Sequence, residues 1–174
     1  MRSGSKREAQ PAAPPELVPW QADVLRAVAR SKLAREVTFG GATALAAVFF
    51  HHRRSEDIEL FLRREAEPSD LRPVAAALRR RGLTVEHRPL GPRRALVALS
   101  GGVEVGHVDF AWFPYEPVDR PVRWQGLRVD SLLDMVVNKL QAVLTRARAR
   151  DFVDLFFLLR EGPEPDLHRL PSPS

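Results

Sequence analysis

The stretch TFGGATALAA, residues 38–47, decides how the first half of this chain folds, because a glycine pair interrupts otherwise apolar sequence. The apolar pattern predicts a short strand over 36–39 and a helix over 42–50. Gly40–Gly41 would join them and allow the backbone to approach a ligand closely. The N-terminus of the helix, with the hydroxyl of Thr43 beside it, would suit a phosphate. A glycine pair is also the composition of an ordinary turn, and that alternative stays open.

The stretch HHRRSEDIELFL, residues 51–62, follows directly. Its alternation predicts a strand over 57–62, with the apolar residues facing the core. Residues two apart on a strand share a face and lie about 7 Å apart, which puts Asp57 and Glu59 together on the polar face. Two carboxylates repel each other there, and a divalent cation such as Mg²⁺ removes the repulsion. The alternative is a half-exposed strand with an ordinary polar face.

A third acid occurs in VEVGHVDFAWF, residues 103–113. Alternation places His107 and Asp109 on the polar face of a strand whose other face is apolar. If this strand is a neighbour of 57–62, three carboxylates converge. If it is not, Asp109 is a surface acid of a hairpin.

The remaining patterns predict an α+β (mixed α/β) fold, a mixed sheet with flanking helices and a helical C-terminal part. Further elements are predicted over 20–33, 70–81, 84–88, 94–99, 131–145 and 151–160. Ser69 is the expected N-cap of helix 70–81 and Gly82 its C′ residue. The proline-rich segment 114–126 is expected to be a loop. Residues 1–19 and 161–174 are expected to be mobile tails around one domain over 20–160.

The composition limits the classes of function. The chain has 174 residues, a net charge of +5 and no cysteine, which excludes disulfides and thiolate metal sites. It has neither a signal peptide pattern nor an apolar run long enough to span a membrane, and a cytoplasmic location is expected. The positive charge would attract phosphates, although an arginine-rich coding bias produces the same charge.

The C-terminal segment carries a second set of candidates. Lys139, Arg146 and Arg150 stand at i, i+7 and i+11 and would form a basic stripe if one helix continued through them. Such a stripe could hold a triphosphate or an RNA backbone, or be a solvated helix face. Asp151 and Asp154 are expected to be a helix cap or ion-pair partners.

Two blocks of the sequence resemble the nucleotidyl transferase AbiEii/AbiGii toxin family. The first block is carried by Gly40, Gly41, Thr43, Ala44, Leu45, His52, Arg53, Ser55, Asp57, Ile58, Glu59 and Phe61. The second is carried by Lys139, Leu140, Ala142, Arg146, Arg150, Asp151, Asp154 and Leu155. This family belongs to the polymerase-β-like nucleotidyltransferase superfamily.

The resemblance implies a metal-dependent nucleotidyltransferase that moves a nucleoside monophosphate from an NTP to an acceptor hydroxyl, with RNA or a tRNA 3′ end as the expected acceptor. It implies Mg²⁺ or Mn²⁺ at Asp57, Glu59 and Asp109, with Lys139 as a further catalytic residue. The expected nucleotide-binding residues are Gly40, Gly41, Thr43, Arg53, Ser55, Lys139 and Arg146. The expected supporting residues are His52, Arg150, Asp151 and Asp154. An antitoxin protein is an expected partner.

The sequence departs from the family pattern at several points. Glu59 stands where aspartate is usual, and its extra methylene shifts a metal ligand by about 1.5 Å. Ala42 is an additional residue between the glycine pair and Thr43, and the chain stops soon after the second block. Two alternatives therefore remain: transfer to a small molecule or protein, and a non-catalytic domain that binds NTP, RNA or a partner.

Overall fold

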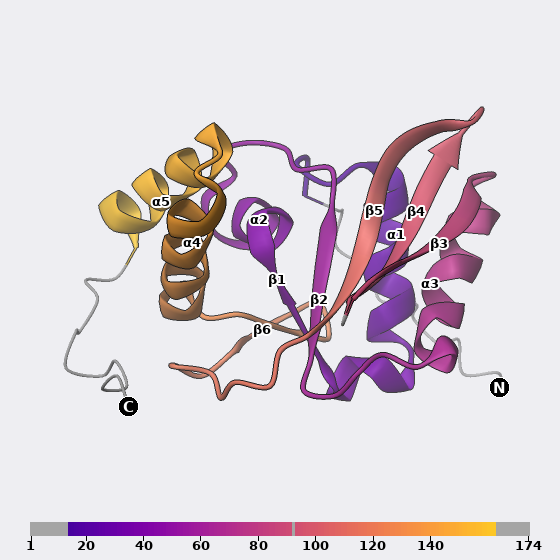
Figure 1. Ribbon diagram of the computed structural model, residues 1–174, viewed down its shortest axis with the longest axis horizontal. Helices are drawn as coiled ribbons and strands as arrows, with labels where there is room; N and C mark the ends of the chain where they lie inside the picture. Colours follow the sequence, from indigo (N-terminus) through magenta and orange to yellow (C-terminus); the bar gives the residue numbers. More distant parts are fainter. Residues whose placement is uncertain (1–13, 92, 163–174) are drawn as a thin grey trace, which may run out of the picture.

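The computed structural model of the protein describes residues 14–91 and 93–162. Within this part the chain forms one mixed sheet of seven strands in the order β3-β4-β5-β2-β1-β7-β6 (Figure 1). The strands are β1 (Val37–Gly40), β2 (Ile58–Leu62), β3 (Thr84–Leu90), β4 (Arg93–Ser100), β5 (Val103–Trp112), β6 (Val122–Trp124) and β7 (Leu127–Val129). The predicted fold class is confirmed.

The helices lie on both sides of the sheet. They are α1 (Pro19–Ala29), α2 (Gly41–Ala44), α3 (Pro68–Arg80), α4 (Leu132–Arg146) and α5 (Ala149–Glu161), with a 3₁₀ turn η1 (Lys32–Arg35) and a π-helical turn η2 (Leu45–Phe50). Residues 1–13 and 163–174 of the two predicted tails lie outside the described residues. Leu17, inside the predicted N-terminal tail, is buried in the core.

The core explains which face of the central strands is free for chemistry. Ile58, Leu60 and Leu62 on β2 are almost fully buried and belong to the same apolar cluster as residues of α1 and α3. The residues between them on β2 are only partly buried, which confirms the predicted alternation. Consequently α1 and α3 cover one face of the sheet, and the polar face of β2 points the other way.

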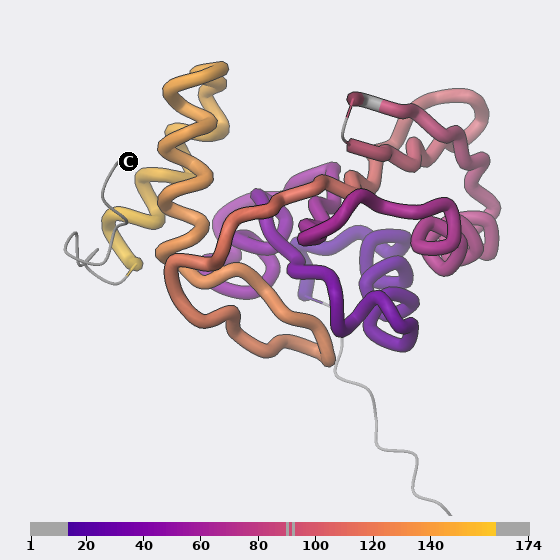
Figure 2. The backbone as a smooth tube through the Cα atoms, turned by 60° about the horizontal axis from the view of Figure 1, so that its bottom comes forward, coloured from indigo at the N-terminus to yellow at the C-terminus, as the bar shows by residue number. Residues whose placement is uncertain are grey.

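The C-terminal helices α4 and α5 pack against each other at one end of the molecule (Figure 1). The hairpin β3–β4 lies at the opposite end (Figure 2). The polar face of β2 and β5 lies between these ends. The two predicted C-terminal helices are separate, because Ala147 ends α4 in the left-handed conformation, with φ of 45°.

Several elements differ from the prediction. The predicted loop 114–126 contains β6, and β7 follows it as a second unpredicted strand. The predicted helix 42–50 becomes a short α-helix followed by a π-helical turn. The N-cap of α3 is Glu67 and not Ser69, because Pro68 occupies the first helical position and Asp70 accepts a hydrogen bond from the Glu67 backbone at 2.8 Å.

The apolar side chains of α4 are only partly covered. Val136 is buried, whereas Leu144 is 86% exposed. Helix α5 adds exposed Phe152 and Phe156. No helix within the described residues is long and apolar enough to cross a membrane.

Candidate active site

The central pair of strands brings the predicted acids together. β2 and β5 are parallel neighbours, and Glu59 lies directly opposite Asp109. Asp57 immediately precedes β2 on the same face as Glu59. The condition that segment 103–113 be a neighbour of 57–62 is therefore met. Two parallel neighbours must be joined by a long connection and not by a tight turn. A hairpin pattern in the sequence therefore does not reveal that β5 pairs with β2.

His107 bridges two of the acids. Its Nδ1 lies 3.0 Å from Oδ1 of Asp57, and its Nε2 lies 3.3 Å from Oδ2 of Asp109. The hydrogen bond with Asp109 raises the pKa of His107 against the opposing effect of burial, and the charge of Asp57 raises it further. The two carboxylates thus favour the positively charged form of the imidazole between them.

The acids of this face are poorly hydrated. Burial raises the pKa of Asp57 despite the charge of His107. Burial also raises the pKa of Glu59 against the attraction of Lys139. Asp109 is 7% exposed, and its buried Oδ1 has no hydrogen-bond partner among the residues that the structure describes. Partly dehydrated carboxylate oxygens of this kind are ligands that a hard divalent cation prefers.

The donor chemistry therefore fits Mg²⁺ or Mn²⁺, but the ligands are not preassembled. The part of the chain that the structure describes contains no group of three His, Cys, Asp or Glu side chains arranged to hold a metal ion. The position of His107 accounts for this, because its ring lies between Asp57 and Asp109. A cation bound to both acids would require the ring to move.

The glycine pair is explained by close packing around Glu59. Gly41 has φ of +70°, and a Cβ there would lie 2.6 Å from the carboxyl carbon of Glu59. A Cβ on Gly40 would overlap the ring of Phe61 and a carboxylate oxygen of Asp130. Only glycine fits both positions, because it has no Cβ and tolerates positive φ. The pair lets helix α2 begin directly against the acidic face.

Two hydrogen bonds hold the segment that carries Asp57. The buried hydroxyl of Thr43 donates to the backbone carbonyl of Asp57. The backbone carbonyl of Ser55 accepts a 2.8 Å hydrogen bond from the buried side chain of Gln21. Thr43 therefore positions Asp57, whereas its predicted contact with a phosphate stays a prediction. Gln21 has no sequence signal beyond its place in a helical pattern.

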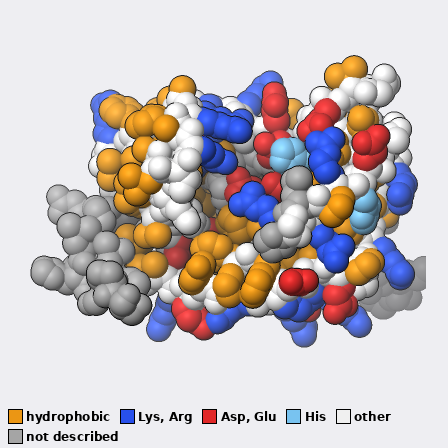
Figure 3. Space-filling view, in the orientation of Figure 1, with side chains coloured by type: hydrophobic (Ala, Val, Ile, Leu, Met, Phe, Trp, Pro, Cys, Tyr) orange, Lys and Arg blue, Asp and Glu red, His pale blue; other side chains and the backbone are white. Residues whose placement is uncertain are grey.

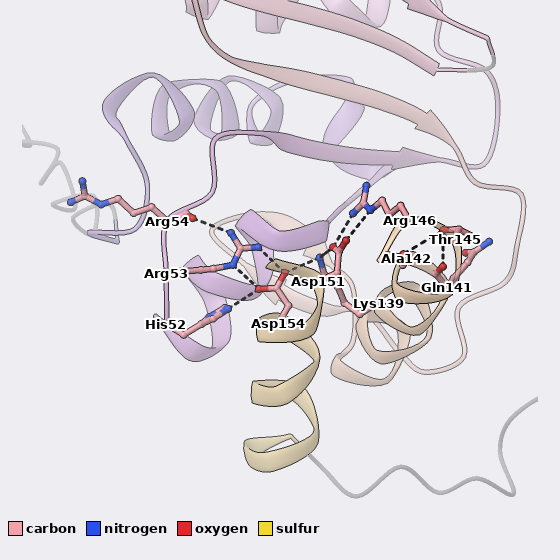
Figure 4. Close-up of polar contacts among 10 residues, drawn as sticks. All are labelled: His52, Arg53, Arg54, Lys139, Gln141, Ala142, Thr145, Arg146, Asp151 and Asp154. Atoms are coloured by element: carbon pink, nitrogen blue, oxygen red, sulfur yellow. Dashed lines mark hydrogen bonds and ion pairs between the residues drawn. The ribbon is translucent and has the colours of Figure 1, made fainter. Parts of the chain in front are cut away.

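The supporting residues form a buried ionic network around Asp154 (Figure 4). Arg53 donates two hydrogen bonds of 2.7 Å to its carboxylate, and Nε2 of His52 lies 2.9 Å away. Nζ of Lys139 lies 2.8 Å from the same carboxylate. Burial raises the pKa of Asp154, but the hydrogen bonds from Arg53, Lys139 and His52 outweigh it and lower the pKa to about 2.

Asp151 forms the second centre of this network. Arg146 donates two hydrogen bonds of 2.9 Å to it, and Nζ of Lys139 lies 3.2 Å from its Oδ1. The predicted ion-pair role of both acids is confirmed. Lys139 is 7% exposed and is shared between the two carboxylates, so its ammonium group is fixed at the border of the acidic face.

A cleft of about 450 Å³ separates the acidic face from the C-terminal helices. Acidic side chains and a histidine gather beside Lys and Arg side chains around this hollow (Figure 3). Its acidic and imidazole lining is Asp57, Glu59, His107, Asp109 and Asp151, and its cationic lining is Arg53, Arg93, Lys139, Arg146, Arg148 and Arg150. The condition for a basic stripe on one continuous helix is not met, since Arg150 belongs to α5, but the helix break still brings Arg150 to this cleft.

The sequence reasoning missed two residues beside the cleft. Asp130 follows β7, and burial with the nearby charges of Asp134 and Glu59 raises its pKa to about 7. Asn138 on α4 donates a 3.5 Å hydrogen bond to Asp130. Asp130 becomes a candidate only when the strand before it, β7, is recognised. This strand has three residues, which are too few to show an alternation pattern.

A family comparison agrees with this geometry. The sequence model described as "Nucleotidyl transferase AbiEii toxin, Type IV TA system" matches residues 23–170. The chain belongs to this family. The matched range contains both the acidic face and the network around Asp154, so the predicted family is confirmed. A search of curated proteins gave no match.

Solved structures show the same fold at low sequence identity. JHP933 from Helicobacter pylori is 19% identical, with a TM-score of 0.61, and the match covers 80% of this chain and 62% of that one. A putative nucleotidyltransferase from H. pylori is 19% identical, with a TM-score of 0.62 and coverage of 80% and 64%. The Megavirus polyadenylate synthase is 14% identical, with a TM-score of 0.55 and coverage of 89% and 35%. This AbiEii family member thus spans less than two thirds of the two H. pylori chains.

Proposed function

We propose that this protein transfers a nucleoside monophosphate from an NTP to an acceptor hydroxyl, as its family membership implies. The observation that carries the proposal is the register of Glu59 against Asp109, with Asp57 on the same face. These three carboxylates would hold Mg²⁺ or Mn²⁺. The ion would neutralise charge on the phosphate oxygens and orient the triphosphate.

The chain's own groups account for the rest of the reaction. The acceptor oxygen attacks the α-phosphorus, the bond from this phosphorus to the bridging oxygen of the β-phosphate breaks, and pyrophosphate leaves. Asp109 accepts the proton of the acceptor hydroxyl through its unpartnered Oδ1. Lys139 and Arg146 lie on the cleft wall and offset the charge that develops on pyrophosphate.

RNA, with a tRNA 3′ end as the specific case, is the acceptor that we favour. The cleft wall carries Arg148 and Arg150 in addition to Lys139 and Arg146. These two further guanidinium groups suit a phosphodiester backbone, because a guanidinium group can form two parallel hydrogen bonds to a phosphate. We further propose that the protein acts as the toxin of a toxin–antitoxin pair, which is the class of its family.

Transfer of label tests this function. The protein is incubated with each labelled NTP and Mg²⁺ or Mn²⁺, and with total RNA, a protein mixture or small metabolites as acceptors. We expect label on RNA, no label with EDTA, and no label with Asp57→Asn. Glu86→Gln is the matched control, because it removes an exposed carboxylate on β3 away from the cleft and should stay active. Label on protein or metabolites, and none on RNA, would show that the acceptor is not RNA.

A second candidate is a non-catalytic nucleotide-binding domain. It is favoured by His107, which lies between Asp57 and Asp109 where a cation would bind both acids. The same experiment distinguishes the two. Metal-dependent binding of NTP with no transfer to any acceptor would support the binding domain and refute the enzyme.

A further inference from the structure

The acidic face becomes aromatic along the direction of its strands. On β2 the face continues from Glu59 to Phe61, and on β5 it continues from Asp109 through Ala111 to Phe113. A step of two residues along a strand is about 7 Å. Phe61 therefore lies one such step beyond the acids, and Phe113 about two steps beyond them.

These rings form a connected group that is open to solvent. The ring centroids of Phe61 and Phe113 are 5.3 Å apart, and those of Phe113 and Tyr115 are 5.2 Å apart in an edge-to-face arrangement. Tyr115 is 69% exposed, so the face of its ring is accessible to a ligand. Phe61 and Phe113 border the acidic cleft and also a side pocket next to it.

The side pocket combines these rings with polar groups. Thr38, Asp130 and Asn138 line it together with the aromatic residues, and Thr38 lies beside Phe61 on the neighbouring strand. The amide of Asn138 can both donate and accept hydrogen bonds, and so can the hydroxyl of Thr38. A flat heterocycle with donors and acceptors along its edge matches this combination of stacking surface and polar edge.

Helix α4 connects this pocket to the phosphate-binding side of the cleft. Asn138 lines both the side pocket and the acidic cleft, and the next residue, Lys139, lines the acidic cleft. A nucleotide with its phosphates between the acids and Lys139 would extend its sugar and base past Phe61. The carboxylates and the rings are separated along the sheet by a distance that a nucleoside spans.

We propose that Phe61, Phe113 and Tyr115 form the nucleobase subsite, in which the base of the NTP stacks on the rings while Asn138 contacts its edge. This inference rests on the proposed nucleotidyl transfer and names the part of the cleft that receives the base. Stacking on aromatic side chains is tolerant of sequence, because every base has a flat face. The subsite therefore gives affinity for NTPs in general, and the polar edge provides the discrimination among them.

A comparison of NTP with inorganic tripolyphosphate isolates the base. Both ligands are titrated calorimetrically into the full chain with Mg²⁺ and no acceptor. We expect Tyr115→Ala and Phe113→Leu each to weaken NTP binding about 10-fold and to leave tripolyphosphate binding unchanged. Tyr115→Phe keeps the ring and should bind NTP like the wild type. Phe156→Ala, which removes a ring that is 53% exposed on α5, is the control and should change neither affinity.

The outcomes separate this inference from the function on which it rests. If the wild type binds neither ligand, the proposed function and the base subsite both fail. If the wild type binds NTP more tightly than tripolyphosphate and Tyr115→Ala and Phe113→Leu retain that difference, only the base subsite fails. Equal weakening of both ligands in these variants would also refute it, because the rings would then be acting on the phosphates.

Discussion

At the scale of single residues, Asp130 is an acid whose surroundings favour its neutral form. It lies beside Gly40, where the carboxylate is largely removed from water and close to the charge of Glu59. Burial raises its pKa from the ordinary value near 3.8 to about 7. A neutral carboxyl group can donate a hydrogen bond as well as accept one, so its chemistry changes within the physiological pH range.

The raised pKa of Asp130 predicts a pH-dependent cost to the folded state. The folded protein binds this proton more tightly than the unfolded chain, so stability falls as pH rises from about 4 to about 7. Full ionisation costs roughly 4 kcal/mol at most. Asp130→Asn should therefore stabilise the protein more at pH 8 than at pH 5, as measured by urea unfolding. An equal effect at both pH values would contradict the raised pKa.

Gly41 has little freedom for substitution. Its φ of +70° is unfavourable for a side chain, and a Cβ would overlap the carboxylate of Glu59. Gly41→Ala should lower the free energy of unfolding by about 3 kcal/mol, from backbone strain together with overpacking. Gly82→Ala is the matched control, because its φ is +75° and nothing lies within 4 Å of a Cβ there. It should cost only about 1 kcal/mol in the same denaturation experiment.

At the scale of elements, the network around Asp154 attaches helix α5 to the segment before β2. Its carboxylate is fully buried and contacts His52, Arg53 and Lys139. His52 and Arg53 come from the middle of the first family block, and Lys139 and Asp154 come from the second. These contacts join the two family blocks in the folded protein, although the blocks lie far apart in the sequence.

Removal of the central acid should be far more costly than removal of a surface ion pair. Asp154→Ala leaves the buried charges of Arg53 and Lys139 without their partner and should cost about 3–5 kcal/mol of unfolding free energy. Glu116→Ala breaks the pair with Arg63, in which both side chains are largely exposed, and should cost less than about 1 kcal/mol. Chemical denaturation of both variants measures the difference. Similar costs would show that the network contributes no more than a surface pair.

The elements also show what the sequence can and cannot predict. Long periodic segments, such as α4 and the central strand β2, were predicted nearly to their ends, because burial imposes a period over many residues. Strands β6 and β7 were missed because three residues contain no period, and their pairing depends on β1. The π-helical turn was missed because its apolar residues fit an ordinary helix equally well.

The candidate site divides in the same way. Alternation in the sequence groups Asp57, Glu59 and Asp109 if their two strands are neighbours. The pairing of β2 with β5 meets this condition. The partners of Lys139 could not be predicted, since they depend on how α4 packs against α5. The bridging position of His107 likewise required the distance between two side chains from different strands.

At the scale of the whole molecule, an ion bound at the acidic face should stabilise the entire fold. A ligand that binds only the folded state adds about 1.4 kcal/mol when its free concentration is ten times its dissociation constant. For a protein of this size the melting temperature should rise by about 4 °C with Mg²⁺. NaCl at the same ionic strength should give a smaller rise, and Asp57→Asn should lose the difference. The same rise with both salts would argue against the metal site.

The buried carboxylate of Asp154 also determines what can be exchanged between relatives. Suppose that α4 and α5 were replaced by the corresponding helices of another protein. Arg53, which stays with the sheet, would then lose its counter-charge unless the new helices supplied an acid at the position of Asp154. The helical pair is therefore no interchangeable module. Chimeras should fold only when the donor segment brings a matching acid.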